Sequence, residues 1–242
     1  MLFYERVGTG PTVVFIHGFL GSSKIYDEIK QDLISTYDTI FIDFAGHGRS
    51  QEQTVDANIY AYAQQIVEVL QHENVTSSTW IGHSMGGYIV LAALEKQLAQ
   101  IDKAVLAYSA TNADNDEAKK KRLTSIEQIE SEGNKAFVDS LIPNFFSKEA
   151  KQEHVELGRH IAYAASEDGL KTALLTMKDR PNQQQLVDTL DIPVLVIEGT
   201  EDKIVPSIET TNPNVKKVQT PTGHLGMIEE PAKFIDALRT FI

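Results

Sequence analysis

Residues 82–86 read Gly-His-Ser-Met-Gly, a Gly-x-Ser-x-Gly pentapeptide between an apolar strand pattern at 79–81 and a helical pattern at 88–98. This context is typical of a nucleophile elbow, in which a strand turns sharply into a helix and presents a strained Ser. Glycines two residues before and two after Ser84 leave room inside the turn, and the new helix points free N–H groups at the reacting centre. An ordinary glycine-rich strand–helix turn is the alternative. Because it lies between a strand pattern and a helical pattern, however, the pentapeptide indicates that Ser84 is a nucleophile.

The composition is ordinary for a soluble globular protein. The chain has 242 residues, 42% hydrophobic and 23% charged, which fits one large α/β domain or a core with an inserted subdomain. A net charge of −12 argues against nucleic acid or an anionic membrane surface as a partner. The absence of cysteine excludes disulfides, thiolate catalysis and Cys-ligated metals. No signal-peptide pattern or membrane-length apolar run is present, so we expect a cytoplasmic protein.

Short, continuous apolar runs alternate with helical patterns along the chain. Such runs are typical of parallel strands buried on both faces, and their alternation with helices predicts a mostly parallel, doubly wound α/β sheet. Residues 2–4 predict an antiparallel edge strand, and a more polar run at 215–219 predicts the last strand. The buried strands are expected at 12–16, 39–42, 79–81, 104–107 and 194–197, with helices at 26–35, 59–72, 88–98 and 231–241.

Residues 111–190 interrupt this alternation. They have a mostly helical pattern with no strong strand, a highly charged beginning, and an apolar stretch at 141–146. We expect a helical lid, inserted after the strand that ends near Tyr108, over the carboxyl ends of the strands, where open parallel sheets bind ligands. Residues 1–110 and 191–242 would then form the core.

A nucleophilic Ser needs a base within hydrogen-bond reach, and that base needs a group that orients it. His224 has the best context of the seven histidines, because it lies in a loop between the last strand and the C-terminal helix. It also fits the chain order Ser, acid, His of the elbow-containing fold. His17 is expected to shape a loop beside Ser84, and the side chain of His83 to point away from the reacting hydroxyl.

The acid should follow the penultimate strand, where the chain reads Glu-Gly-Thr-Glu-Asp at 198–202. We predict Asp202, with Glu201 as the alternative, because adjacent side chains diverge. An oxyanion hole needs two N–H donors. The backbone of Met85, directly after the nucleophile, and of Phe19, in the loop at 17–21, are the candidates.

The substrate pocket is harder to predict. Apolar side chains near the lid and the elbow suggest an uncharged acyl or alcohol group, although these residues could equally be ordinary core. The candidates are Tyr88, Leu141, Phe145, Phe146 and Met227. Arg122, Arg159, Lys178 and Arg180 could instead hold an anionic substrate if any of them faces the pocket.

Five motifs, in this order, resemble those of the α/β-hydrolase superfamily. They are His-Gly-Phe at 17–19, Asp-Phe-Ala-Gly-His-Gly-Arg-Ser at 43–50, Gly-His-Ser-Met-Gly-Gly at 82–87, Gly-Thr-Glu-Asp at 199–202 and Gly-His at 223–224. The resemblance covers nearly the whole chain and is to small bacterial carboxylesterases and lactonases. It implies a Ser84–Asp202–His224 triad, and a structural turn at 43–50 beneath the oxyanion loop.

The chain also departs from the family pattern. The first strand of the eight-stranded sheet is missing, which leaves about seven strands. The helix between Asp202 and His224 is reduced to 206–214, which predicts a looser triad. Haloalkane dehalogenases and epoxide hydrolases of this fold use Asp where Ser84 stands. The vitamin K pathway synthase is expected to carry Arg soon after the nucleophile, whereas Tyr88 follows Gly87 here.

These residues predict a serine hydrolase, with neither cofactor nor metal, that cleaves small, mainly uncharged carboxylic esters or lactones through an acyl-enzyme. Two alternatives stay open. One is a low-turnover protein that binds a small ligand under the lid, as some relatives do. The other is carbon–carbon bond hydrolysis or lyase chemistry on the same scaffold. The sequence does not determine the oligomeric state.

Overall fold

The computed structural model describes residues 1–242 and contains one seven-stranded sheet with strand order β1-β3-β2-β4-β5-β6-β7. Six strands run parallel, and β1 at the edge is antiparallel to β3. This architecture confirms the predicted fold class. The strands are β1 (Phe3–Gly8), β2 (Thr12–Ile16), β3 (Asp38–Asp43), β4 (Ser78–His83), β5 (Ile101–Ala107), β6 (Val194–Gly199) and β7 (Val215–Thr220).

The central strands are buried on both faces, which explains their continuous apolar sequences. All six residues of β3 are buried, as are the last four of β5. The edge strand β7 exposes Lys216 and Lys217, and charges of this kind discourage pairing with another sheet.

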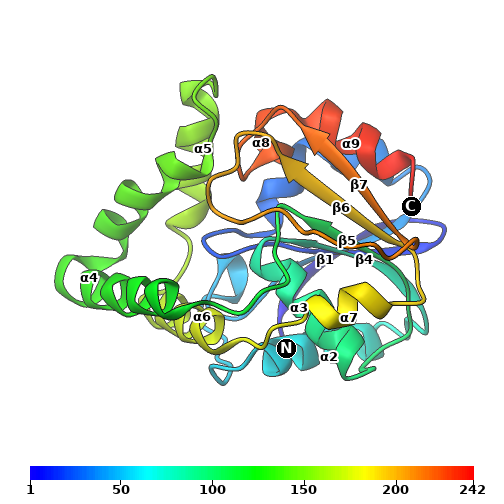
Figure 1. Cartoon of the computed structure of the whole chain (residues 1–242), viewed down its shortest axis with the longest axis horizontal. Helices are drawn as coiled ribbons and strands as arrows, with labels where there is room; N and C mark the ends of the chain where they lie inside the picture. The colour runs from blue at the N-terminus through cyan, green and yellow to red at the C-terminus, as the bar shows by residue number, and fades with distance from the viewer.

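Helices cover both faces of this sheet (Figure 1). One face carries α2 (Ile59–His72), α3 (Met85–Glu95) and α7 (Gln184–Thr189). The opposite face carries η1 (Ser23–Ile29), α1 (Lys30–Leu33), α8 (Gly226–Glu229) and α9 (Pro231–Arg239). A short turn, η2 (Gly48–Ser50), follows β3. In α2 the buried residues recur at helical spacing, and the Asn58 side chain caps the first turn by accepting the Tyr60 N–H, a contact worth about 1 kcal/mol.

One local prediction is confirmed and another was wrong. The N-terminal strand β1 is an antiparallel edge strand, as predicted, and it pairs with β3 because both edges of β2 are occupied by its parallel neighbours β3 and β4. Residues 206–214 form no helix. There the Asn212 side chain instead donates hydrogen bonds to the carbonyls of Val187 and Leu190, which ties the segment to the end of α7.

The chain between β5 and α7 is helical and lies at the carboxyl ends of the strands, on the left of Figure 1. It docks on the core through backbone contacts, because the Ser166 N–H donates to the Gly46 carbonyl and the His224 N–H donates to the Phe145 carbonyl. Its role as a lid, with boundaries at 111 and 190, stays a prediction. The elements are α4 (Asp116–Leu141, kinked at Gly133), η3 (Ile142–Phe145), α5 (Gln152–Ala162) and α6 (Glu167–Asp179).

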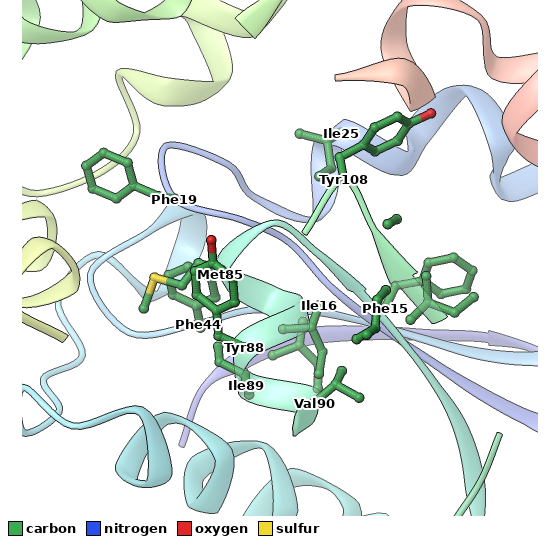
Figure 2. Close-up of a cluster of buried hydrophobic side chains, with 14 of the residues drawn as sticks. Phe15, Ile16, Phe19, Ile25, Phe44, Met85, Tyr88, Ile89, Val90 and Tyr108 are labelled. Atoms are coloured by element: carbon green, nitrogen blue, oxygen red, sulfur yellow. The ribbon is translucent and has the colours of Figure 1, made fainter. Parts of the chain in front are cut away.

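A hydrophobic core connects α3 to the sheet, and Figure 2 shows Met85, Tyr88, Ile89 and Val90 of this helix near Ile16. Nearly every residue of α3 is buried. This packing holds the N-terminus of α3 in a fixed position at the carboxyl end of β4. No helix in the chain is both long and apolar enough to cross a bilayer.

Candidate active site

Ser84 occupies a strained turn between the last residue of β4 and the first of α3. Its φ of 50° and ψ of −116° lie outside the regions that L residues ordinarily adopt, which costs about 1–3 kcal/mol. The turn is tight, because a Cβ on Gly82 would lie 2.4 Å from the backbone of Gly86. Ser109 secures it by donating its hydroxyl hydrogen to the Ser84 carbonyl at 2.8 Å. The Gly-x-Ser-x-Gly sequence thus forms a strained elbow.

A hydrogen-bonded chain leads from Ser84 through His224 to Asp202. The Nε2 atom of His224 lies 2.8 Å from Ser84 Oγ, and its Nδ1 lies 2.8 Å from Asp202 Oδ2. A carboxylate accepts only, so His224 donates from Nδ1 and is free to accept the Ser84 proton at Nε2. The side chains of His224 and Asp202 are 1% and 5% exposed, which shields these bonds from water. Both distances are those of ordinary hydrogen bonds despite the missing helix at 206–214.

The two adjacent acids in this loop point to different partners. Asp202 accepts the His224 Nδ1–H with one oxygen and the Ile204 N–H, at 2.8 Å, with the other. Glu201 instead accepts the Lys148 N–H at 3.4 Å. The structure therefore places Asp202, and not Glu201, beside the histidine.

Two further side chains hold the His224 loop, and sequence reasoning missed both roles. The buried His83 ring donates its Nε2–H to the His224 carbonyl at 2.9 Å. The Glu229 carboxylate accepts the Gly223 N–H at 2.9 Å and also the Ser147 N–H. The available sequence signal for Glu229 was an acidic residue shortly after the histidine in the chain.

The loop at 17–21 packs directly against the elbow. A Cβ on Gly18 would lie 2.8 Å from Ser84 Cβ and 2.7 Å from His83 Nδ1, so only glycine fits. The next residue, Phe19, makes no intramolecular hydrogen bond through its N–H. The Met85 N–H, as the first in α3, has no partner one turn earlier in its helix. An oxyanion hole made by these two donors stays a prediction.

His17, His47 and His83 are all fully buried near the elbow. The His17 Nε2 accepts the Phe44 N–H at 3.2 Å and its Nδ1 donates to the Gly18 carbonyl at 2.8 Å, so this ring is neutral and supports the loop. Burial lowers the pKa of His17 to about 4 and the pKa of His47 to about 3. Burial also lowers the pKa of His83 well below its ordinary value.

We expect the free energy of unfolding to fall as the pH drops from 6.5 to 5. Unfolded histidines bind protons below about 6.5, whereas the three buried rings stay neutral until the pH approaches their lowered pKa values. Each ring then contributes a slope of up to about 1.4 kcal/mol per pH unit. Urea unfolding at several pH values measures the slope. His47→Gln should reduce it, while His72→Gln on the exposed end of α2 should not; equal slopes in all three proteins would contradict the prediction.

A cavity of about 920 Å³ opens at Ser84. Three of the five predicted pocket residues line it, namely Tyr88, Leu141 and Phe145, and so does Phe19, the predicted oxyanion donor. Other parts of the wall come from α4, from Leu174 and Met177 of α6, and from 203–206.

Phe146 and Met227 do not line this cavity, which differs from the prediction. The Phe146 ring packs on Gly158 of α5, where a Cβ would lie 2.9 Å from the ring. Met227 is fully buried in α8. Both side chains are buried members of the hydrophobic core.

Two of the four predicted cationic candidates, Arg122 and Arg180, line the cavity. Arg159 pairs with Glu156 and Asp139, and Lys178 pairs with Asp179, all outside the lining. No group of three or more histidine and acidic side chains is arranged to hold a metal ion.

The fold and sequence match known hydrolases. An esterase from Thermogutta terrifontis, solved with malate bound, superimposes with a TM-score of 0.91 at 27% identity, over 99% of this chain and 92% of that one. The enol-lactonase of Burkholderia xenovorans LB400 superimposes with a TM-score of 0.89 at 18% identity, over 99% and 95%, which shows the fold alone.

Curated sequences and a family model are also similar to this chain. An uncharacterized protein of Mycobacterium tuberculosis is 24% identical over 99% of this chain and 77% of its own length. Esterase YbfF of Escherichia coli is 36% identical over 38% of this chain and 36% of its own. The family model described as the alpha/beta hydrolase fold matches residues 11–231. With this sheet, this elbow and this match, the chain belongs to the α/β-hydrolase family.

Proposed function

We propose that this chain is a serine hydrolase that cleaves carboxylic esters or lactones through an acyl-enzyme, without a cofactor. The observation that carries the proposal is the hydrogen-bonded chain Asp202–His224–Ser84, which ends on a strained Ser at the wall of a large cavity. A nucleophile, its base and the group that orients the base are then all within hydrogen-bond distance.

The reaction begins when Ser84 Oγ attacks the ester carbonyl and its proton moves to His224 Nε2. Asp202 stays ionised, keeps the His224 Nδ1–H oriented and stabilises the imidazolium. The N–H groups of Met85 and Phe19 donate to the developing oxyanion, a contribution of about 3–4 kcal/mol for a single donor in related chemistry. His224 then protonates the leaving alcohol. In the second half, His224 takes a proton from a water molecule, whose oxygen attacks the acyl carbonyl. The bond to Ser84 Oγ then breaks, the acid leaves, and His224 returns the proton to Ser84 Oγ.

The positioning contacts support this mechanism. His83 and Glu229 hold the backbone on either side of the His224 ring, and Ser109 holds the Ser84 carbonyl. Each contact fixes a reacting side chain before substrate binds, and such preorganisation lowers the barrier of the chemical step. The Thermogutta terrifontis esterase, which shares the fold at 27% identity, supports ester hydrolysis as the reaction class.

The test is the time course of 4-nitrophenyl acetate, butyrate and octanoate hydrolysis. We expect steady turnover, with butyrate and octanoate accepted because the cavity of about 920 Å³ exceeds the size of either acyl group. A stoichiometric burst without turnover would support a ligand-binding protein instead. The absence of any reaction with all three esters would count against ester hydrolysis.

A further inference from the structure

The cavity at Ser84 is basic, although the chain as a whole carries a net charge of −12. Clustered cations around a cavity attract anionic ligands and raise their local concentration. Five cationic side chains line it, Lys120, Lys121, Arg122, Arg180 and Lys203, against two acidic ones, Asp114 and Glu117.

Part of the positive charge of the cavity comes from a nearly buried ion-pair cluster. Arg180 and Asp114, whose side chains are 7% and 4% exposed, form an ion pair, and Arg180 also donates to the carbonyls of Met177 and Asn112. The same Asp114 carboxylate accepts the Nε–H of Arg122 at 3.0 Å. One carboxylate thus serves two guanidinium groups, which leaves one positive charge uncompensated at the cavity wall.

The Arg122 side chain has hydrogen-bond donors without a partner in the chain. Only its Nε has a partner in the chain, and both Nη groups are free. Its side chain is 28% exposed and lines the cavity. Because Asp114 holds Nε, the guanidinium is already oriented. A planar guanidinium with two free Nη groups matches the geometry of a carboxylate.

The cluster is connected to the helix that follows the candidate nucleophile. Tyr88 lies four residues after Ser84, one helical turn into α3, and its buried ring forms part of the cavity wall. The Arg180 guanidinium lies over that ring, 4.3 Å from its centre. Apolar walls from Phe19, Leu141 and Phe145 complete the lining near Ser84. The cavity therefore has an apolar part and a cationic part.

We propose that the preferred substrates are esters that also carry a carboxylate, bound by the free Nη groups of Arg122 while the ester carbonyl lies at Ser84. The class is the monoester of a dicarboxylic acid, or an ester with an equivalent anionic end. This inference rests on the proposed ester hydrolysis. It changes the expectation of a mainly uncharged substrate, which came from apolar residues alone.

A matched pair of substrates tests the preference: mono-4-nitrophenyl adipate, which is anionic, and 4-nitrophenyl hexanoate, which has the same acyl length and is neutral. Arg122→Gln should lower kcat/KM for the adipate ester about tenfold to a hundredfold, the range of a lost charge-assisted hydrogen bond, chiefly through KM. It should leave the hexanoate ester within about twofold. The control is Arg239→Gln, which makes the same charge change at an exposed pair with Asp32 and should alter neither. Equal effects of Arg122→Gln on both esters would overturn the proposal.

A salt titration of the wild-type protein gives a second readout if Arg122→Gln fails to fold. Raising the ionic strength from about 50 to about 500 mM should lower kcat/KM for the adipate ester several-fold and leave the hexanoate ester nearly unchanged. The same salt response for both esters would contradict an anionic subsite.

A binding measurement distinguishes a failure of this inference from a failure of the proposed ester hydrolysis. Monomethyl adipate should bind Ser84→Ala at least about tenfold more tightly than dimethyl adipate by calorimetry, and Arg122→Gln in that background should abolish the difference. Equal affinities would overturn the carboxylate subsite even if esters are hydrolysed. Conversely, a retained preference in a protein that hydrolyses neither ester would remove ester hydrolysis and leave the subsite standing.

Discussion

Replacing Ser84 by alanine is expected to lower kcat/KM for 4-nitrophenyl butyrate by about 10⁴-fold or more. The substitution removes the oxygen that forms the acyl bond and leaves His224 Nε2 without its 2.8 Å partner. Only positioning and the candidate oxyanion donors remain, and these cannot replace a nucleophile. Initial rates of wild type and variant, at matched protein concentration, measure the loss.

The fold should survive this change. Ser84 is almost fully buried, its Oγ bonds only to His224, and alanine can occupy the same backbone conformation at a similar cost. Ser131→Ala on the exposed face of α4, outside the cavity lining, is the matched control and should retain wild-type rates. Comparable turnover by wild type and Ser84→Ala would show that this serine is not the nucleophile.

Asp202→Asn should lower kcat/KM about 10³-fold to 10⁴-fold, by reversing the histidine tautomer. In the native loop one carboxylate oxygen accepts the Ile204 N–H and the other accepts the His224 Nδ1–H. An asparagine keeps its carbonyl oxygen on the Ile204 N–H, so its NH₂ group faces Nδ1. His224 must then carry its proton on Nε2 and cannot accept one from Ser84.

The adjacent acid provides a matched control, because Glu201→Gln removes the same charge one residue away. Glu201 accepts only the Lys148 N–H, so its replacement should change the rate by less than about threefold. The pH–rate profiles of the three proteins complete the measurement. A larger loss in Glu201→Gln than in Asp202→Asn would reverse the assignment of the orienting acid.

Local sequence patterns predicted the sheet well. Continuous apolar runs appear where a strand is buried on both faces, and the structure has strands at each predicted place. The prediction was wrong where long-range contacts override local preference. Residues 206–214 form no helix, because the Asn212 side chain is hydrogen-bonded to the end of α7.

The candidate active site shows the same contrast between local sequence patterns and long-range contacts. By itself the sequence determined the strand–helix alternation, the strained elbow at Ser84 and the order of the candidate residues, because these follow from periodicity and backbone geometry within a few residues. Only the tertiary structure decided that Asp202 rather than Glu201 faces His224, that His83 and Glu229 hold its loop, and that Arg122 has free donors in the cavity. Ser84 and His224 are 140 residues apart, and the direction of each side chain depends on packing between distant elements, which no local pattern encodes.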